Sequence, residues 1–301
     1  MSSGTANRAP RSTVSVLMVN YNGGEMLERA LGHLSAVADE WDEVVLADNG
    51  SSDGSPARVQ GAFPDIRLLR LGANLGFGTA NNRAAAEAVG DYLLLLNSDA
   101  WPRPGTVDIL RRHLDENETL GLVAPRLVYP DGSPQFNWAP TTSVIGETIQ
   151  RVRNLFEPFP WVHRLRPATG GWFTAACALL RREAFEAVGG FDEDFFLYFE
   201  DVDLSLRLRR AGWGLTEVDA EAVHVKGGSQ VAVSADGRPQ AVTVGSQLNY
   251  RLGQARYYRK HRPLWEQRLM RLKIRRKLKD PEARILLDRE YERTVTEGEG
   301  A

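Results

Sequence analysis

Short apolar runs alternate with helix-forming stretches through the first hundred residues. TVSVLMVNYNG, at residues 13–23, is mostly apolar until it ends in Asn and Gly, which is typical of a buried strand followed by a loop. A helix is predicted at about Glu25 to Ala38, and DEVVLADNGSSDGS then repeats the pattern of a strand and a polar turn. IRLLRLGANLGFGTANNRAAAEAVG and DYLLLLNSDA add a third strand, a helix that stops at Gly90 and a fourth strand. This alternation predicts an α/β fold with a mostly parallel sheet covered on both faces.

Each of the four predicted strands is followed by polar side chains. Ligands of an open parallel sheet bind at the carboxyl ends of its strands, so these side chains are expected to share one crevice. Asn, Asp and Gly are also ordinary turn residues, which explains any one strand end taken alone. The residues concerned are Asn20, Asn22, Asp48, Asn49, Asn74, Asn97 and Asp99.

The fourth strand end, Asn97-Ser98-Asp99, predicts the most specific chemistry. A carboxylate at the tip of a buried strand suits a hard divalent cation, and a cation with few protein ligands is typically completed by phosphate oxygens. The pattern therefore indicates Mg or Mn together with a nucleotide. Gly72, Gly76 and Gly78 do not have the G-x-G-x-x-G spacing, and no P-loop motif occurs. Hydride transfer and P-loop phosphoryl transfer are disfavoured.

The composition is that of a globular protein with a basic C-terminal segment. With 301 residues, 43% of them hydrophobic, the chain can form one large domain or one domain with an appendage. The formal net charge is -2, yet residues 251–279 contain twelve Lys or Arg and one acid, Glu266. This segment is predicted to be a helix that either contacts anionic lipid or packs, solvated, on the rest of the protein. Nucleic-acid binding is disfavoured because no recognised nucleic-acid module accompanies the charge.

The cysteine content and the N-terminus bear on the compartment. Cys177 is the single cysteine, which excludes an intramolecular disulfide, and its apolar surroundings predict a packing role. Residues 1–12 lack the apolar core of a signal sequence and are predicted to be disordered, and no apolar run is long enough to span a bilayer. These features favour a cytoplasmic protein whose membrane contact would be peripheral, at the inner face.

Six motifs occur in a fixed order that is more specific than any one of them: VNYN, ADNGSSDGS, NLGFGTANN, LLLNSDA, GGFDEDFFLYFEDVDLSLRLRRAGW and HVKGG. In this order the chain resembles the inverting glycosyltransferases of family 2, and among them the rhamnosyltransferase-like branch. The resemblance covers about residues 13–230 and implies the GT-A fold, with a catalytic domain at residues 13–245. Its donor half would be about residues 13–100 and its acceptor half about 101–245, followed by a basic helical extension at residues 246–301.

The resemblance assigns the strand-end residues to the donor, a nucleotide diphosphate sugar. Asp48 matches the family aspartate that binds the nucleotide base, and residues 97–99 occupy the D-x-D position, with Asn in place of the first Asp. Asp99 would bind Mn or Mg, and His224 matches the third metal-binding position, although a lone His is more often structural. Neutral imidazole suits Mn better than Mg. The implied donor-binding residues are Asn20, Asn22, Asp48, Asn74, Asn82, Asn97 and Asp99.

The acidic and aromatic stretch FDEDFFLYFEDVDL is assigned to the acceptor side. Asp201 matches the family's general base, which takes the proton of the acceptor hydroxyl as it attacks the anomeric carbon. Glu200 and Asp203 would orient acceptor hydroxyls, and Trp172 would line the acceptor site or belong to the core. The acids, followed by Arg residues and Gly212, also match a helix with a compensated dipole. VDLSLRLR alternates with the period of a strand, but the capping signals favour the helix.

Together these features predict an inverting hexosyltransferase that acts in cell wall or polysaccharide biosynthesis. It would move a sugar, with L-rhamnose as the leading candidate, from a nucleotide diphosphate donor to a glycan or a lipid-linked acceptor. The alternatives are a family 2 transferase of another sugar, such as N-acetylglucosamine or galactose, and a non-catalytic protein that binds nucleotide sugars. The presence of Asp99 and Asp201 argues against the last of these.

Overall fold

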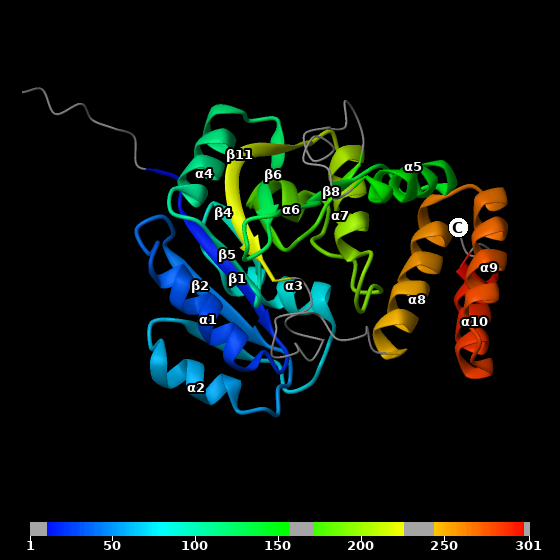
Figure 1. The fold of residues 1–301 in the computed structure, drawn as a ribbon, viewed down its shortest axis with the longest axis horizontal. Helices are drawn as coiled ribbons and strands as arrows, with labels where there is room; N and C mark the ends of the chain where they lie inside the picture. The colour runs from blue at the N-terminus through cyan, green and yellow to red at the C-terminus, as the bar shows by residue number, and fades with distance from the viewer. Residues whose placement is uncertain (1–10, 157–170, 226–243, 298–301) are drawn as a thin grey trace, which may run out of the picture.

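The computed structural model of the chain describes residues 11–156, 171–225 and 244–297. Figure 1 shows a curled central sheet flanked by helices, with a helical C-terminal region at one end of the molecule. The segment predicted to be disordered is residues 1–12, and its residues 1–10 lie outside the described residues.

The first hundred residues form the predicted alternation of strands and helices. β1 pairs in parallel with both β2 and β4, and β2 pairs in parallel with β3. The elements are β1 Val14–Asn20, α1 Gly24–Ser35, β2 Glu43–Asp48, α2 Ser55–Ala62, β3 Arg67–Arg70, α3 Phe77–Glu87 and β4 Tyr92–Asn97. The expected helix after β1 is present, and it ends three residues before Ala38.

The next part of the chain extends this sheet. It contains β5 Ala100–Pro102, α4 Thr106–Glu116, β6 Leu120–Val128, β7 Pro134–Gln135, β8 Trp138–Ala139, α5 Val144–Leu155, β9 Trp172–Phe173, β10 Cys177–Arg181, α6 Arg182–Ala187, α7 Glu200–Arg210 and β11 Gly214–His224. The described residues give a nine-stranded sheet in the order β3-β2-β1-β4-β10-β6-β11-β5, with β7 beside β6. β10 runs antiparallel to both of its neighbours, and β5 runs antiparallel to β11, so the sheet is mixed beyond β4.

Both faces of the central strands are buried, which explains their unbroken apolar runs. In β1, Val16 and Met18 pack on the face covered by α1, α2 and α4, whereas Leu17 and Val19 pack on the face covered by α3, α6 and α7. A fully buried aliphatic side chain contributes about 1.5–3 kcal/mol relative to its exposed state. The predicted covered sheet is therefore confirmed.

The C-terminal region consists of three helices: α8 Val244–His261, α9 Leu264–Lys277 and α10 Pro281–Glu297. α8 begins two residues before the predicted boundary at 245/246. These helices share an apolar cluster with α7 and the loop before it, in which Tyr257 and Tyr258 of α8 meet Phe199 and Val202. The predicted basic segment thus packs on the rest of the protein, and none of the helices in the described ranges is both long and apolar enough to cross a membrane.

Candidate active site

The carboxyl ends of the parallel strands meet at one edge of the sheet, as the sequence predicts. Asn20 of β1 stands opposite Asp48 of β2 in the strand register, and Val19 stands opposite Asn97 of β4. The amide of buried Asn20 donates to Asp48 Oδ1 at 3.0 Å, and its Oδ1 accepts from the Gly23 amide at 3.0 Å. The strand-end side chains form one connected polar edge.

Asn49, which follows β2, fixes the loop that carries Asn74. Its Oδ1 accepts from the amide of Leu75 at 2.8 Å, and its Nδ2 donates to Asn74 Oδ1 at 2.9 Å. Asn22 has a left-handed backbone, with φ of 53°, and its Oδ1 accepts from the amide of Ser52. Asn49 is a strand-end residue that the family pattern does not assign to the site, and its position beside Asp48 is the sequence signal for it.

Asn82, which the sequence assigns to the donor, is bonded through its amide to the loop before α7. Its Oδ1 accepts from the backbone amide of Phe191 at 2.8 Å, and its Nδ2 donates to the Phe191 carbonyl at 2.9 Å. A donor-binding role for Asn82 would require breaking this two-point contact. Asn82 instead anchors the acidic, aromatic loop that leads to α7.

Gly76 brings the same loop against the strand-end edge. It has φ of 89°, and a Cβ built on it would lie 2.4 Å from the carbonyl oxygen of Phe196. Only glycine permits this approach. The neighbouring amide of Phe77 donates to that carbonyl at 2.9 Å, which joins the two halves of the site.

The pair predicted to bind metal is brought together by pairing between β5 and β11. His224 Nε2 lies 3.4 Å from Asp99 Oδ1, and both side chains are largely buried. Gln135 Nε2 donates to the His224 carbonyl, so its Oε1 must accept, and it lies 2.6 Å from His224 Nδ1. His224 Nδ1 therefore donates its proton to Gln135. This hydrogen bond orients the ring so that Nε2 faces Asp99. The sequence pattern gave no indication of Gln135.

This pair fits a divalent cation chemically. An imidazole nitrogen and a carboxylate oxygen that face one another at 3.4 Å are two ligands that one cation can bind together. Within the described residues, the buried Oδ1 of Asn97 has no hydrogen-bond partner and adds an acceptor at the same strand end. No cluster of three or more His, Cys, Asp or Glu with metal-binding spacing occurs in the ranges that the structure describes.

α7 begins at the predicted place and points its first residues into a pocket. Tyr198 and Phe199 both have positive φ, 68° and 73°, which reverses the chain immediately before Glu200. Asp201 Oδ1 accepts from the amide of Val202 at 2.8 Å. Positive φ at two successive aromatic residues is strained, and strain of this kind is common at functional sites.

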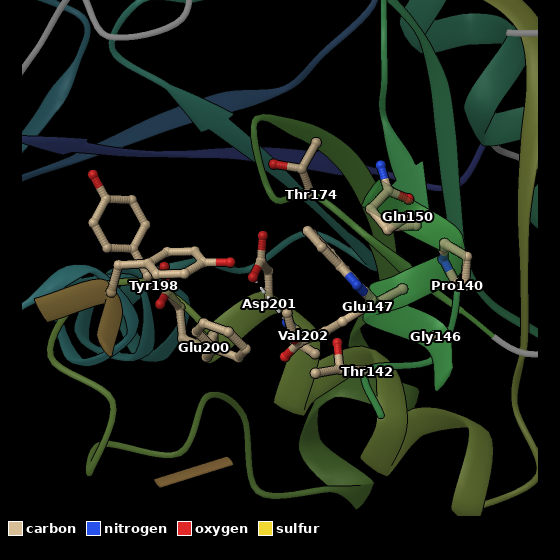
Figure 2. A pocket seen from close by; sticks show the side chains of 14 residues that line it. Pro140, Thr142, Gly146, Glu147, Gln150, Thr174, Tyr198, Glu200, Asp201 and Val202 are labelled. Carbon is tan, nitrogen blue, oxygen red and sulfur yellow. Dashed lines mark hydrogen bonds between the residues drawn. The ribbon is translucent and has the colours of Figure 1, made fainter. Parts of the chain in front are cut away.

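The pocket has a volume of about 270 Å³ and is built from several separate parts of the chain. Asp201 lies centrally among its lining residues, with Tyr198 and Glu200 on one side and Glu147 and Gln150 of α5 on the other (Figure 2). The lining residues are Ala139, Pro140, Thr142, Gly146, Glu147, Gln150, Trp172, Thr174, Tyr198, Phe199, Glu200, Asp201, Val202 and Tyr250. Trp172 lines this pocket and also packs against the apolar cluster beneath α7.

Burial makes Asp201 a stronger base than an ordinary carboxylate. It raises the pKa of Asp201 from 3.8 to about 6, and hydrogen bonds from the amides of Val202 and Ala175 oppose the rise. The pKa of Glu200 is raised well above its usual value, chiefly by burial and then by the charge of Asp201. Glu200 Oε2 is buried without a hydrogen-bond partner in the described part of the chain. One carboxylate is thus ionised near neutral pH beside a second that favours its protonated form.

Asp203, which the sequence assigns to the acceptor, is not among the residues that line this pocket. Its side chain is fully buried, with Oδ2 accepting from Arg207 at 2.6 Å and Oδ1 lying 2.6 Å from His261 Nε2. Residues two apart on a helix point in different directions, and Asp203 turns toward α8. Its bond to His261 joins α7 to α8.

The pocket also contains residues that sequence reasoning missed. Glu147 and Gln150 come from α5, in the part of the chain predicted to be the acceptor half. Tyr250 comes from α8, in the segment predicted to be an appendage. Their sequence separation from Asp201 left no local signal.

The strand-end edge and the adjoining pocket belong to a known class of enzyme, the GT-A glycosyltransferases. The structure aligns with a mannosyltransferase from Pyrobaculum calidifontis, solved with GDP-mannose and Mn2+, at a TM-score of 0.53 and 19% identity, covering 96% of this chain and 76% of that one. Residues 15–189 match the family described as glycosyl transferase family 2. The chain belongs to glycosyl transferase family 2.

Two curated relatives share most of the chain. An N-acetylglucosaminyl-diphospho-decaprenol L-rhamnosyltransferase of Mycobacterium tuberculosis is 39% identical over 231 residues, which cover 70% of this chain and 75% of the relative. A low-salt glycan biosynthesis hexosyltransferase of Haloferax volcanii is 26% identical over 217 residues, covering 70% of this chain and 66% of the relative.

Proposed function

We propose that this glycosyltransferase moves L-rhamnose, with inversion, from a nucleoside diphosphate donor to a sugar carried on a polyprenyl diphosphate. The observation that carries the proposal is the 39% identity over 231 residues to the mycobacterial L-rhamnosyltransferase, which acts on N-acetylglucosaminyl-diphospho-decaprenol. The pocket around Asp201 supports it, because it has room for one sugar ring beside a carboxylate base.

Asp201 acts as the general base in this proposal. Its carboxylate takes the proton from the acceptor hydroxyl while that oxygen forms a bond to the anomeric carbon. The bond from the anomeric carbon to the diphosphate breaks on the opposite face, and the bonding electrons leave with the nucleoside diphosphate. Tyr198, Phe199 and Trp172 exclude water from the reacting oxygen. Glu200, kept protonated, donates a hydrogen bond to the acceptor sugar.

The strand-end edge is assigned to the donor. Asp48 and Asn20 would bind the nucleoside, and Asn22, Asn74 and Asn97 would bind ribose or sugar hydroxyls. Asp99 and His224 would hold a divalent metal, for which Mn suits the imidazole better than Mg does. When bound, the metal neutralises charge on the departing diphosphate.

The decisive experiment supplies a panel of nucleoside diphosphate sugars, each with N-acetylglucosaminyl diphosphate on a short alkyl chain as acceptor. Transfer of rhamnose, detected by mass spectrometry, is expected with the rhamnose donor and not with the N-acetylglucosamine, galactose or mannose donors. Transfer of one of the other sugars would replace the rhamnose assignment. Donor binding without transfer to any acceptor would favour a non-catalytic role.

A lipid-linked acceptor implies work at a membrane, and we assign membrane contact to α5 and α9. Along α9, Leu264, Trp265, Leu269 and Leu272 are at least half exposed. α5 exposes Ile145, Ile149, Val152 and Leu155 on one side, while its other side lines the pocket. The start of α5 meets α9 through a hydrogen bond from the Val144 amide to Glu266, and Figure 1 shows α5 beside the ends of α8 and α9.

The charge of this surface favours an anionic bilayer at the inner face of the membrane. Arg268 and Arg276 are exposed among the apolar side chains of α9, a combination typical of helices that lie in the lipid interface. Sedimentation with anionic and with neutral liposomes tests the assignment. Ile149→Asn with Leu269→Asn is expected to abolish binding to anionic liposomes. Unchanged sedimentation of this double variant would remove the membrane role from α5 and α9.

A further inference from the structure

Four cations from three helices surround one pocket residue, Glu147. Lys273 of α9 forms an ion pair with Glu147 at 2.6 Å. Arg251 of α8 donates to Gln254, which in turn donates to Glu147 at 2.6 Å. Arg151 lies one turn beyond Glu147 on α5, and Lys277 lies one turn beyond Lys273 on α9. Four positive charges against one carboxylate leave a local excess.

The cations are close enough to repel one another. The contacts of Val144 with Glu266 and of Glu147 with Lys273 set α5 and α9 side by side, and Arg151 and Lys277 each follow one turn further along their helix. Desolvation and the charges of Arg251, Lys273 and Arg151 lower the pKa of the exposed Lys277, and the charge of Glu147 opposes this. A cluster of like charges of this kind is stabilised by an anion with several acceptor oxygens.

The cluster adjoins the proposed base through Tyr250. Burial raises the pKa of Tyr250, the charges of Glu147 and Asp201 raise it further, and Arg251 opposes the rise. The ring of Tyr250 lines the pocket, and the guanidinium of Arg251 lies over it, 5.1 Å from the ring centroid. One residue therefore separates the catalytic carboxylate from the cations.

We propose that Arg151, Arg251, Lys273 and Lys277 form the binding site for the diphosphate group of the acceptor. The proposal rests on the proposed lipid-linked acceptor and names the part of the protein that would recognise it. The acceptor sugar occupies the 270 Å³ pocket with its hydroxyl at Asp201, and the diphosphate on the anomeric carbon of that sugar extends past Tyr250 to the cations. The exposed apolar side of α5 then lies next to the start of the lipid chain.

The test compares two soluble acceptors in lipid-free buffer. One is N-acetylglucosaminyl diphosphate on a short alkyl chain, and the other is the alkyl glycoside of N-acetylglucosamine, which lacks both phosphates. Wild-type protein is expected to have a higher kcat/KM with the diphosphate. Arg151→Gln and Lys277→Gln should each lower kcat/KM for the diphosphate about tenfold, through KM, because a charge-assisted hydrogen bond is lost. The kcat/KM of both variants for the glycoside should equal that of the wild-type protein.

Arg275→Gln is the matched control, since Arg275 lies on α9 and faces Asp288 of α10 at 3.7 Å. Arg275→Gln should leave kcat/KM unchanged for both acceptors. Equal losses for both acceptors in Arg151→Gln and Lys277→Gln would overturn the site and indicate a structural role. An unchanged preference of these variants for the diphosphate acceptor would also overturn the site. This holds even if the variants no longer sediment with anionic liposomes, because the cations would then bind the lipid surface. Failure of the proposed function looks different, because wild-type protein would then transfer rhamnose to neither acceptor.

Discussion

Replacement of the proposed base, Asp201→Asn, separates proton transfer from the hydrogen bond that Asp201 makes at the start of α7. Asn keeps the shape of the side chain and an oxygen that can accept from the Val202 amide, now 2.8 Å away. It cannot take a proton from the acceptor hydroxyl. Transfer should therefore fall by at least about 10²-fold, the lower end for loss of a positioned base, while the donor affinity is unchanged.

The Asp201→Asn variant should be more stable than the wild-type protein at neutral pH. The pKa of Asp201 rises from 3.8 to about 6 on folding, so its ionised form at neutral pH costs on the order of 3 kcal/mol before solvent screening reduces the figure. As the pH rises, Asp201 loses its proton at a lower pH in the unfolded state than in the native state. The native state therefore loses stability between these two pKa values. The neutral Asn removes this cost. The melting temperature at pH 7.5 should rise by a few degrees.

The assay measures transfer to the matched acceptor, donor binding by calorimetry and thermal unfolding on the same preparation. Glu200→Gln is the neighbouring control and should lose less activity, because it keeps a donor at a position where the carboxylic acid is protonated. Near-normal transfer by Asp201→Asn would refute the base assignment, and a larger loss in Glu200→Gln would move the base to Glu200. Asp203 is not proposed as the base, because Arg207 and His261 occupy its oxygens.

Three further predictions test other parts of the site. Transfer by the wild-type enzyme should increase between pH 5 and 7 with an apparent pKa of about 6, because Asp201 must be ionised, and a flat profile would contradict this. Asp99→Ala should weaken nucleoside diphosphate binding in Mn far more than in chelator, and equal affinities for mutant and wild type under both conditions would remove the metal role. His261→Ala should lower the free energy of unfolding by about 1–3 kcal/mol, measured in urea, because it removes a partner from buried Asp203. The additional Asp203→Asn change should recover part of the loss, and independent effects would show that the two side chains are not coupled.

The sequence determined the fold of the first hundred residues to a large extent. Strands buried on both faces must be almost wholly apolar, so the runs at residues 14–20 and 92–97 are visible without a structure. The carboxyl ends of parallel strands must share an edge, which brings Asn20 and Asp48 together. α7 was also predictable, since its acids, its Arg residues and Gly212 are local signals of a helix with two defined ends.

Only the tertiary structure decided which acidic side chain of α7 does what. Asp201 and Asp203 have the same chemistry and nearly the same position in sequence, but one faces the pocket and the other faces His261 on α8. The turn of the helix separates them, and the choice of face depends on packing against helices more than forty residues away.

The neighbours of α5 likewise decided which side of this helix faces inward. Its sequence has an apolar side and a polar side, and sequence reasoning places the apolar side of a helix against the core. In the structure Gly146, Glu147 and Gln150 face the pocket, whereas Ile145 and Ile149 are exposed. The polar side faces inward because Glu147 finds partners on α8 and α9. Contacts between segments more than a hundred residues apart leave no periodic trace in a single sequence, so the pocket beside Asp201 is set by the tertiary structure.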